Sequence, residues 1–309
     1  MSQETNEYSF EVESPSHLRV SNIRGSVDVK PGDEGVITVV AVKHLDSGDA
    51  DETEIVVKQL DDGQVVVETR YQKSGLGWLG VNRPCKVDYV IRTPVACSVK
   101  MGCVSSEASI QGLEGEFVFT TVSGSMALKE LSGPVKFSNV SGKVAAEEIV
   151  GPLKMDTVSG QVRVAKSQLP SVNGSTVSGH VTLQTPLTEG PYKFNSVSGH
   201  LTLVTPEDTG CNVQISSLSG SAKVGLPVTS RTGGRSRQRI EVGGGGPEVQ
   251  IKSVSGYLRL VDSEDQVKVR QVSREKVEPS PPKESQMDIL DKIDRGELSV
   301  EEALQKLNA

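Results

Sequence analysis

The chain has 309 residues, with 33 Lys and Arg against 40 Asp and Glu, a formal net charge of −7 and only 4% aromatic residues. This length can bury a sizeable core in one large domain or in two ordinary ones. The acidic balance argues against a general nucleic-acid binder, because phosphate binding depends on clustered positive charge. The scarcity of aromatic residues argues against base-stacking platforms and aromatic sugar clefts, and the 31 Gly residues with many β-branched residues favour β structure.

The amino terminus and the cysteines bear on the compartment. Residues 1–14 are polar and acidic, without the basic and apolar regions of a secretory signal. The longest apolar run, Val36–Val42, is too short to cross a membrane. We therefore expect a cytoplasmic protein with no transmembrane segment. Its cysteines are irregularly spaced without a CxxC pair, which predicts reduced thiols rather than disulfides or metal ligands; they are Cys85, Cys97, Cys103 and Cys211.

Residues 1–95 form the first predicted domain, an N-terminal β cap. Six segments read as strands, and Leu60–Gln64 between two of them is a hairpin-turn signal. The segment Asn22–Val29 predicts a first, diverged copy of the repeat that follows. We expect an irregular antiparallel cap, because the open end of a stacked β structure needs cover. The predicted strands are 8–12, 25–29, 36–42, 54–60, 65–71 and 87–91.

Residues 96–265 form the second predicted domain, which is built on a tripeptide repeat. Val-Ser-Gly, or once Leu-Ser-Gly, recurs at intervals of 18, 18, 19, 20, 21 and 36 residues. An imperfect copy begins at Val104, 18 residues before the first. Chance does not place seven such tripeptides at so steady a pitch, so the interval is the length of a structural unit. The tripeptides begin at Val122, Val140, Val158, Val177, Val197, Leu218 and Val254.

Each unit predicts two short strands that meet at the tripeptide. Apolar residues stand five and three positions before the Val, as at Phe117 and Phe119, and four and six positions after it, as at Met126 and Leu128. Both pairs alternate with polar residues, which is typical of strands with one buried face. The two alternations are out of phase, so the chain must bend at the tripeptide, where Gly supplies the positive φ that such a bend often needs. Gly-Pro pairs predict a second corner at 133–134, 151–152 and 190–191.

A unit of this length cannot bury its apolar face alone, but stacked copies can, with each strand continuing a parallel ladder about 4.8 Å from its neighbour. The predicted fold class is therefore all-β: a parallel β-solenoid of about eight rungs of 18–21 residues, each rung being one turn, with the antiparallel N-terminal cap. An up-and-down barrel or a sandwich is the competing architecture. Neither requires one corner tripeptide to return at a fixed interval.

The end of the chain differs in composition. The interval of 36 residues is twice 18 and predicts one degenerate rung with a mobile basic loop at Arg231–Arg239. Residues 266–286 are polar and rich in Pro, which is typical of a linker. Residues 287–309 predict a small helical hairpin, with apolar residues at helical spacing and a capping box at Ser299–Glu302. Helices this short are unstable alone, so we expect them to dock on the solenoid or on a second copy.

Outward positions of a solenoid stack in columns, so a site should show as a column. The position after Gly places His180 and His200 on adjacent rungs, where they could share a metal ion or form a pH-sensitive pair. That column holds no third ligand, so two exposed histidines are the simpler interpretation. The position four before the Val is either a weak anion-binding stripe or a solvated strand face; it holds Val118, Lys136, Lys154, Asn173, Lys193, Gln214 and Gln250.

The most regular polar column stands just before the Val, and the Ser column follows the Val. We expect both to be structural, because stacked hydroxyls can hydrogen-bond one another or the backbone along the ladder. The Arg231–Arg239 loop could contact nucleic acid or acidic lipid, but a Gly-rich loop beside an acidic body makes this the weaker hypothesis. The polar column is Thr121, Asn139, Thr157, Thr176, Ser196, Ser217 and Ser253.

An enzyme has to be considered, because polysaccharide-cleaving enzymes also use parallel β-helices. Such chemistry typically needs two carboxylates about 5–9 Å apart across a groove. Only Asp156 is acidic two positions before the Val, and Glu147 and Glu148 stand side by side in a corner. The sequence also contains no HExxH or P-loop motif. We therefore predict that the chain is not an enzyme, and we assign no catalytic, cofactor-binding or metal-binding residue.

Three segments carry a family resemblance that covers residues 10–261. The segment Asn22–Val29, the strand Lys86–Pro94 and the ladder of Thr/Asn/Ser-Val-Ser-Gly are similar to the bacterial putative-adhesin domain of unknown function, with a likeness to GIN-type adhesin heads. The tail Ile289–Leu304 resembles the short SHOCT-like helical modules that accompany such domains. The resemblance implies the solenoid fold, no catalytic residues, and a tail that mediates oligomerisation or recruitment.

The leading hypothesis is therefore a non-catalytic scaffold or protein-interaction protein of adhesin-like type. We expect a protein partner, or self-association through the C-terminal helices, with no cofactor and no nucleic acid; peripheral envelope association stays open. The alternative is a carbohydrate-binding or carbohydrate-active β-solenoid. A third hypothesis is a regulatory module that contacts nucleic acid or membrane through Arg231–Arg239.

Overall fold

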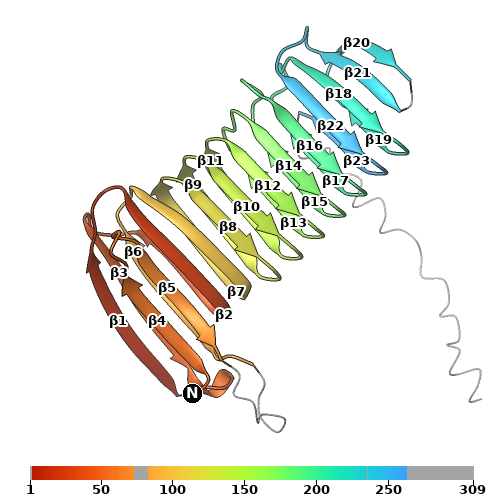
Figure 1. The fold of residues 1–309 in the computed structure, drawn as a ribbon. Coiled ribbons are helices and arrows are strands. Elements are labelled where there is room, and N and C mark those ends of the chain that lie inside the picture. Colours follow the sequence, from red (N-terminus) through yellow and green to blue (C-terminus); the bar gives the residue numbers. More distant parts are fainter. Residues whose placement is uncertain (1, 73–82, 235, 263–309) are drawn as a thin grey trace, which may run out of the picture. The chain divides into compact units, whose positions relative to one another are not determined.

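The computed structural model describes residues 2–72, 83–234 and 236–262, which belong to one compact unit. These residues form a sheet of twenty-three strands, with a short 3-10 turn at Leu45–Ser47 (Figure 1). The predicted all-β solenoid is confirmed. The predicted linker at 266–286 and the predicted helical hairpin at 287–309 lie outside the described residues.

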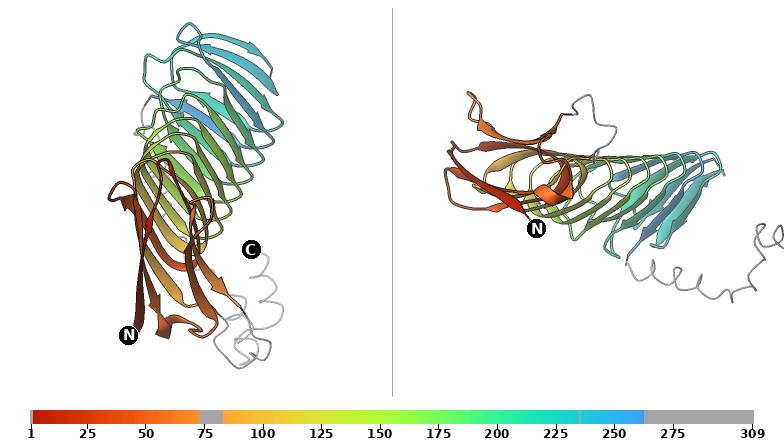
Figure 2. Two further views of the ribbon diagram at one scale, coloured as in Figure 1. Left: turned by 60° about the vertical axis from the view of Figure 1, so that its left-hand side comes forward. Right: turned by 90° about the horizontal axis from the view of Figure 1, so that it is seen from below.

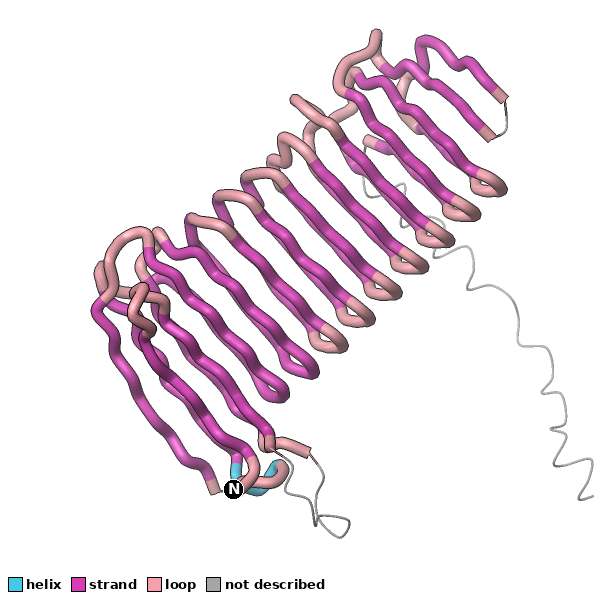
Figure 3. Tube along the Cα trace, viewed as in Figure 1, coloured by secondary structure: helices cyan, strands magenta, loops and turns pink. Residues whose placement is uncertain are grey.

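Two parallel ladders make the body of the stack, and each repeat unit adds one strand to each ladder (Figures 1 and 3). Equivalent residues pair directly, as Lys136 does with Lys154 in the first ladder and Val144 with Val162 in the second. The first ladder contains β8 (Phe117–Thr121), β10 (Val135–Asn139), β12 (Leu153–Thr157), β14 (Val172–Thr176) and β16 (Tyr192–Ser196). The second contains β9 (Ser125–Ser132), β11 (Lys143–Val150), β13 (Gln161–Ala165), β15 (His180–Gln184) and β17 (His200–Val204).

Two long strands begin the stack, each running through both ladders. β7 (Cys97–Glu114) pairs with β8 through its first half and with β9 through its second half. β2 (Ser16–Pro31) lies parallel to β7, from the pair of Ser16 and Cys97 to the pair of Val29 and Ile110. The first diverged rung predicted at Asn22–Val29 is thus confirmed, and it extends beyond that segment.

The N-terminal cap continues both ladders beyond β2. In the second ladder β6 (Lys86–Thr93) lies parallel to β2, and β3 (Val36–His44) and β1 (Gln3–Glu11) follow in antiparallel pairing. In the first ladder β5 (Val65–Tyr71) lies parallel to β2, and β4 (Thr53–Gln59) pairs antiparallel with β5 across the predicted hairpin turn. The antiparallel cap is confirmed, although its junction with the stack is parallel.

The last two rungs do not stack in sequence order. β22 (Glu248–Ser253) lies between β16 and β18 (Cys211–Ser217), and β23 (Tyr257–Val261) lies between β17 and β19 (Ser221–Val224) (Figure 1). The final repeat of the chain is therefore inserted beneath the previous one. Sequence intervals measure the length of a unit and do not show which unit it stacks on.

The residues between these two rungs form an antiparallel hairpin. β20 (Val228–Gly233) pairs with β21 (Arg237–Val242), and β21 pairs with the outer edge of β18. The degenerate rung predicted in this interval is therefore wrong, because the segment covers the open edge of the first ladder instead. The hairpin and β1 lie at opposite ends of the stack (Figure 2).

The core lies between the two ladders. The inward positions predicted from alternation are buried, as Phe117, Val135 and Leu153 are before the corner and Met126 and Val144 are after it. At the second corner Gly133 and Gly151 have φ of +127° and +139°, a conformation that favours glycine. Each rung thus closes through two corners around a narrow interior filled mainly by aliphatic side chains.

Candidate functional site

The Gly of each corner tripeptide allows adjacent rungs to approach closely. A Cβ on Gly142 would lie 2.0 Å from the carbonyl oxygen of Gly124, and one on Gly124 would lie 1.9 Å from the carbonyl oxygen of Ser106. Positive φ was the expected reason for this Gly, but the positive φ values fall on glycines of other turns. Contact between backbones of stacked rungs is the actual reason.

The Ser of each tripeptide connects its rung to the neighbouring one. The Ser141 hydroxyl donates to the carbonyl oxygen of Val122 at 3.1 Å, and the Ser141 backbone N–H donates to the same oxygen at 2.9 Å. The inserted last repeat makes the same hydrogen bond to its neighbour in space, since the Ser255 hydroxyl donates to the carbonyl oxygen of Val197 at 3.4 Å. The expected structural role of this column is confirmed.

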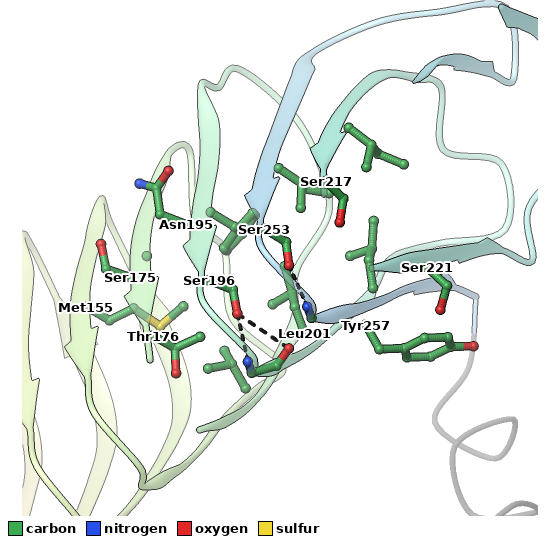
Figure 4. A pocket seen from close by; sticks show the side chains of 18 residues that line it. Met155, Ser175, Thr176, Asn195, Ser196, Leu201, Ser217, Ser221, Ser253 and Tyr257 are labelled. Carbon is green, nitrogen blue, oxygen red and sulfur yellow. Dashed lines mark hydrogen bonds between the residues drawn. The ribbon is translucent and has the colours of Figure 1, made fainter. Parts of the chain in front are cut away.

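The polar residue before the Val holds the corner itself. The Asn139 Oδ1 accepts a hydrogen bond from the Gly142 N–H at 2.9 Å, and the Ser196 and Ser253 hydroxyls accept from the glycine N–H three residues on at 2.9 and 2.7 Å (Figure 4). These side chains therefore satisfy a backbone donor within their own turn. Hydrogen bonding along the ladder was expected for this column, whereas the bond within the turn is made in five of its seven members, which include Asn, Thr and Ser. The hydroxyls of Thr121 and Thr157 are buried without a hydrogen-bond partner.

The Val of the tripeptide has no comparable structural task. It projects from the corner with 42–48% of its surface exposed in all seven valine copies, and Leu218 is 81% exposed. Sequence reasoning missed this, because apolar residues at repeated positions are normally expected in the core. We call these residues the valine column; they are Val104, Val122, Val140, Val158, Val177, Val197, Val254 and Leu218.

A groove of about 710 Å³ runs along the stack beside the valine column. One wall is formed by five members of the valine column, and the other by the outward column two positions earlier, which includes Thr120, Ser138 and Asn195. The five are Val140, Val158, Val177, Val197 and Val254. Asp156 and Lys252 are the charged residues among the described residues that line it. The groove can therefore offer apolar contact and hydroxyl hydrogen bonds to a ligand that lies along several rungs.

The histidines predicted to be neighbours do lie together. The rings of His180 and His200 are stacked with centroids 4.8 Å apart and planes 5° apart, and the Tyr257 ring follows at 6.3 Å. Tyr257 takes the place expected for Ser221 because of the exchanged rung order. In the described part of the chain no group of three or more His, Cys, Asp or Glu residues could hold a metal ion, so no metal site is assigned to this column.

The carboxylates considered for glycoside hydrolysis lie on different ladders. Glu147 in β11 accepts a hydrogen bond from the Lys166 ammonium at 2.6 Å, which lowers the pKa of Glu147. Glu148 is exposed in the same corner, whereas Asp156 lies on the outer face of β12. This arrangement gives no support to a catalytic carboxylate pair formed by these three residues.

A polar cluster in the cap has no signal in the sequence, because its members come from three strands. The Asp88 carboxylate lies 2.6 Å from His44 Nε2 and accepts hydrogen bonds from the Ser26 hydroxyl and backbone N–H, both at 2.7 Å. Burial alone would raise the pKa of Asp88, but these hydrogen bonds lower it. Asp88 joins two chain segments of the cap, and its acceptor oxygens are used within the fold.

The remaining buried groups are structural. All four cysteines are buried free thiols, and burial raises the pKa of Cys211 to about 11. An interior space of about 30 Å³ lies near Gly174, where Met155, Leu201 and other apolar side chains of successive rungs meet (Figure 4). A space of this size holds about one water molecule, so it is a packing defect and not a ligand site.

Comparisons with known proteins agree with the fold. No curated protein matches the chain. A solved structure of a putative lipid binding protein from Parabacteroides distasonis is 12% identical, with a TM-score of 0.53, and the match covers 84% of this chain and 97% of that one. A putative adhesin from Bacteroides fragilis is 11% identical over 84% and 97% of the two chains, with a TM-score of 0.47. At such identities the first structure is similar in fold alone.

No helix among the described residues is long and apolar enough to cross a membrane. The family match ends at residue 261 and does not extend into the predicted helical tail. It spans both ladders and most of the cap. Because the Toastrack DUF4097 profile matches residues 16–261, the chain belongs to that family.

Proposed function

We propose that the chain is a non-catalytic, adhesin-like interaction protein and that the groove beside the valine column is its docking surface for a protein partner. One observation carries this proposal. Of the four positions in the Thr/Asn/Ser-Val-Ser-Gly corner, the first polar residue, the Ser and the Gly have a structural role. The Val, in contrast, is half-exposed in every rung that carries it. Exposed apolar side chains scattered singly need no explanation, but a continuous column does.

The size of the column fits an extended protein contact. Eight stacked residues at rung spacing span about 34 Å, which is the scale of a standard protein interface. The hydroxyls of the opposite wall give a partner hydrogen-bond donors and acceptors at the same spacing. The scarcity of charge in the groove favours a partner whose contacting surface is apolar and neutral.

The groove is tested by replacing Val140, Val158 and Val177 together with Thr, which keeps the β-branched shape and removes apolar surface. We expect proteins captured from an extract of the source organism by the full-length chain to be lost with this variant. The matched control is Val150→Thr, because Val150 is 46% exposed but lies at the second corner. An unchanged set of captured proteins would contradict the proposed docking surface.

The predicted helical tail is proposed as a second interaction element, which mediates oligomerisation or recruitment. Its short amphipathic segments at 287–309 need a partner surface to be stable. Deleting residues 278–309 should lower the number of chains per particle, obtained from the molar mass measured by light scattering, and an unchanged number would exclude self-association through the tail. A cytoplasmic location is also proposed, and cell fractionation tests it.

A further inference from the structure

The outer face of the first ladder carries a continuous column of basic side chains. Strand pairing places ten residues in line from β2 to β21, and six of these are basic and none is acidic. We call the six the basic column: Arg19, Lys100, Lys136, Lys154, Lys193 and Arg239. The remaining four are Val118, Asn173, Gln250 and Gln214. Three lysines of this column were visible in the repeat, but its continuation into β2, β7 and β21 depends on the observed pairing.

These side chains are exposed, and within the described residues no ion pair neutralises them. The outward column two positions later adds Lys252 and Arg237 and contains Asp156. The outward column two positions earlier contains acidic residues at three places, and one of them, Glu248, accepts a hydrogen bond from Gln214. The other two are Glu116 and Glu241. Positive charge is therefore concentrated along the centre of this face.

This concentration stands against the charge of the whole chain, which is −7. At rung spacing the ten positions span about 43 Å, and neighbouring basic residues lie within one or two Debye lengths of each other. Their mutual repulsion is relieved by a counter-surface of negative charge that follows the same line. Such a counter-surface has to be extended, because a single small anion would reach only one or two rungs.

The valine column runs parallel to the basic column, four residues along the strands and thus about 13 Å away. The face therefore combines a line of positive charge with a line of apolar side chains, separated by small hydroxyl and amide residues such as Ser138 and Ser175. A bilayer interface offers this combination, with phosphates in its headgroup layer and hydrocarbon below. A nucleic-acid backbone or a uniformly acidic polypeptide offers negative charge but no apolar layer beside it, so it matches the basic column alone.

We propose that the outer face of the first ladder binds peripherally to the surface of a bilayer that contains anionic lipids. The basic column contacts lipid phosphates, and the valine column contacts the apolar boundary beneath them. This goes beyond the proposed protein docking, because it assigns a partner to the basic column. The valine column takes part in both contacts, so the bilayer and the protein partner compete for it. Each Lys or Arg near such a surface raises binding about fivefold, so three of them account for about 100-fold.

The test is co-sedimentation of the full-length chain with vesicles. We expect binding to phosphatidylcholine vesicles that contain about 30% phosphatidylglycerol, at least tenfold stronger than binding to pure phosphatidylcholine, and loss of binding as salt rises from about 0.15 to 0.5 M. Replacing Lys136, Lys154 and Lys193 with Gln should weaken binding about 100-fold. The matched control replaces Lys86, Lys143 and Lys223 with Gln, which removes the same charge from the second ladder and should leave binding within about threefold of the original.

Absence of vesicle binding, equal binding to neutral vesicles, or equal loss in both triple variants would each overturn the proposal. Retention on heparin or polyglutamate without vesicle binding would overturn it in favour of a soluble polyanion. Different results would refute the proposed protein docking and the proposed membrane binding. The Lys→Gln variant should keep the captured protein partners that the Val→Thr variant loses, and circular dichroism of each variant shows whether the fold is intact.

Discussion

Gly142→Ala tests whether backbone contact between rungs is what requires the corner glycine. The added Cβ would lie 2.0 Å from the Gly124 carbonyl oxygen, whereas ordinary contacts of such an atom begin near 3.4 Å. Relief requires the backbones of two adjacent rungs to separate by more than an ångström. The same carbonyl oxygen accepts the Lys143 N–H at 3.2 Å, so separation also breaks a ladder hydrogen bond.

The expected cost follows from these two effects. Overpacking of a close contact costs about 1–3 kcal/mol, and each lost hydrogen bond costs about 1 kcal/mol. We therefore expect the free energy of unfolding to fall by about 3 kcal/mol, which lowers the melting temperature by about 6–12 °C for a unit of this size. Gly102→Ala is the matched control, because nothing lies within 4 Å of its added Cβ.

Thermal unfolding followed by circular dichroism measures the difference between the two variants. Gly102→Ala should melt at or slightly above the temperature of the original chain, since Ala loses less conformational freedom than Gly in a strand. If Gly142→Ala melted within about 1 °C of Gly102→Ala, close rung contact would not be the reason for the glycine column.

Three other changes have defined outcomes. Asn139→Ala removes the acceptor of the Gly142 N–H and should lower the free energy of unfolding, measured in urea, by about 1–3 kcal/mol. Asn139→Ser should lower it less, because Ser accepts the same hydrogen bond in other rungs, and an equal decrease in both variants would contradict the corner role. Glu148→Gly should raise that free energy by about 0.5–1 kcal/mol, because Glu148 has φ of +58°, and a decrease would show that its side chain matters more than its backbone. Because folding lowers the pKa of Asp88, its carboxylate stabilises the fold above the unfolded-state pKa, and this stabilisation is lost as pH falls through the folded-state pKa. Asp88→Asn should therefore make the free energy of unfolding depend less on pH below about pH 4, and an equal pH dependence in both chains would refute this.

The solenoid was predictable because every rung repeats the same local requirements. The same sequence pattern therefore recurs at each interval. It consists of two alternations that are out of phase, a Gly that leaves room for the next backbone, and a polar residue at the corner. The pairing of β2 with β7 was predictable only in part, since Asn22–Val29 matches the pattern and Ser16–Ser21 does not. The position of β22 between β16 and β18 was not predictable, because both rungs carry equally good corners and only three-dimensional packing selects their order.

The candidate site was predictable to a smaller extent. Stacking of His180 on His200 and the lysines of the basic column follow directly from the repeat, since residues at equal positions share a column. The outward orientation of the corner Val does not follow, because hydrophobicity alone gives no sign that a residue lies outside the turn. The cluster around Asp88 depends on contacts between strands far apart in sequence, which no local pattern records.

The inserted rung constrains when the stack can be completed. β18 pairs with β21 on one side and with β22 on the other, and β19 pairs with β23. Neither β18 nor β19 therefore joins the stack until the later segment 248–261 has paired with β16 and β17. The ladders can therefore extend in sequence order only as far as β17, and residues 211–246 join them once the segment 248–261 has been made. The last repeat of the sequence therefore connects two earlier parts of the stack, while the hairpin of β20 and β21 covers the outer edge of β18.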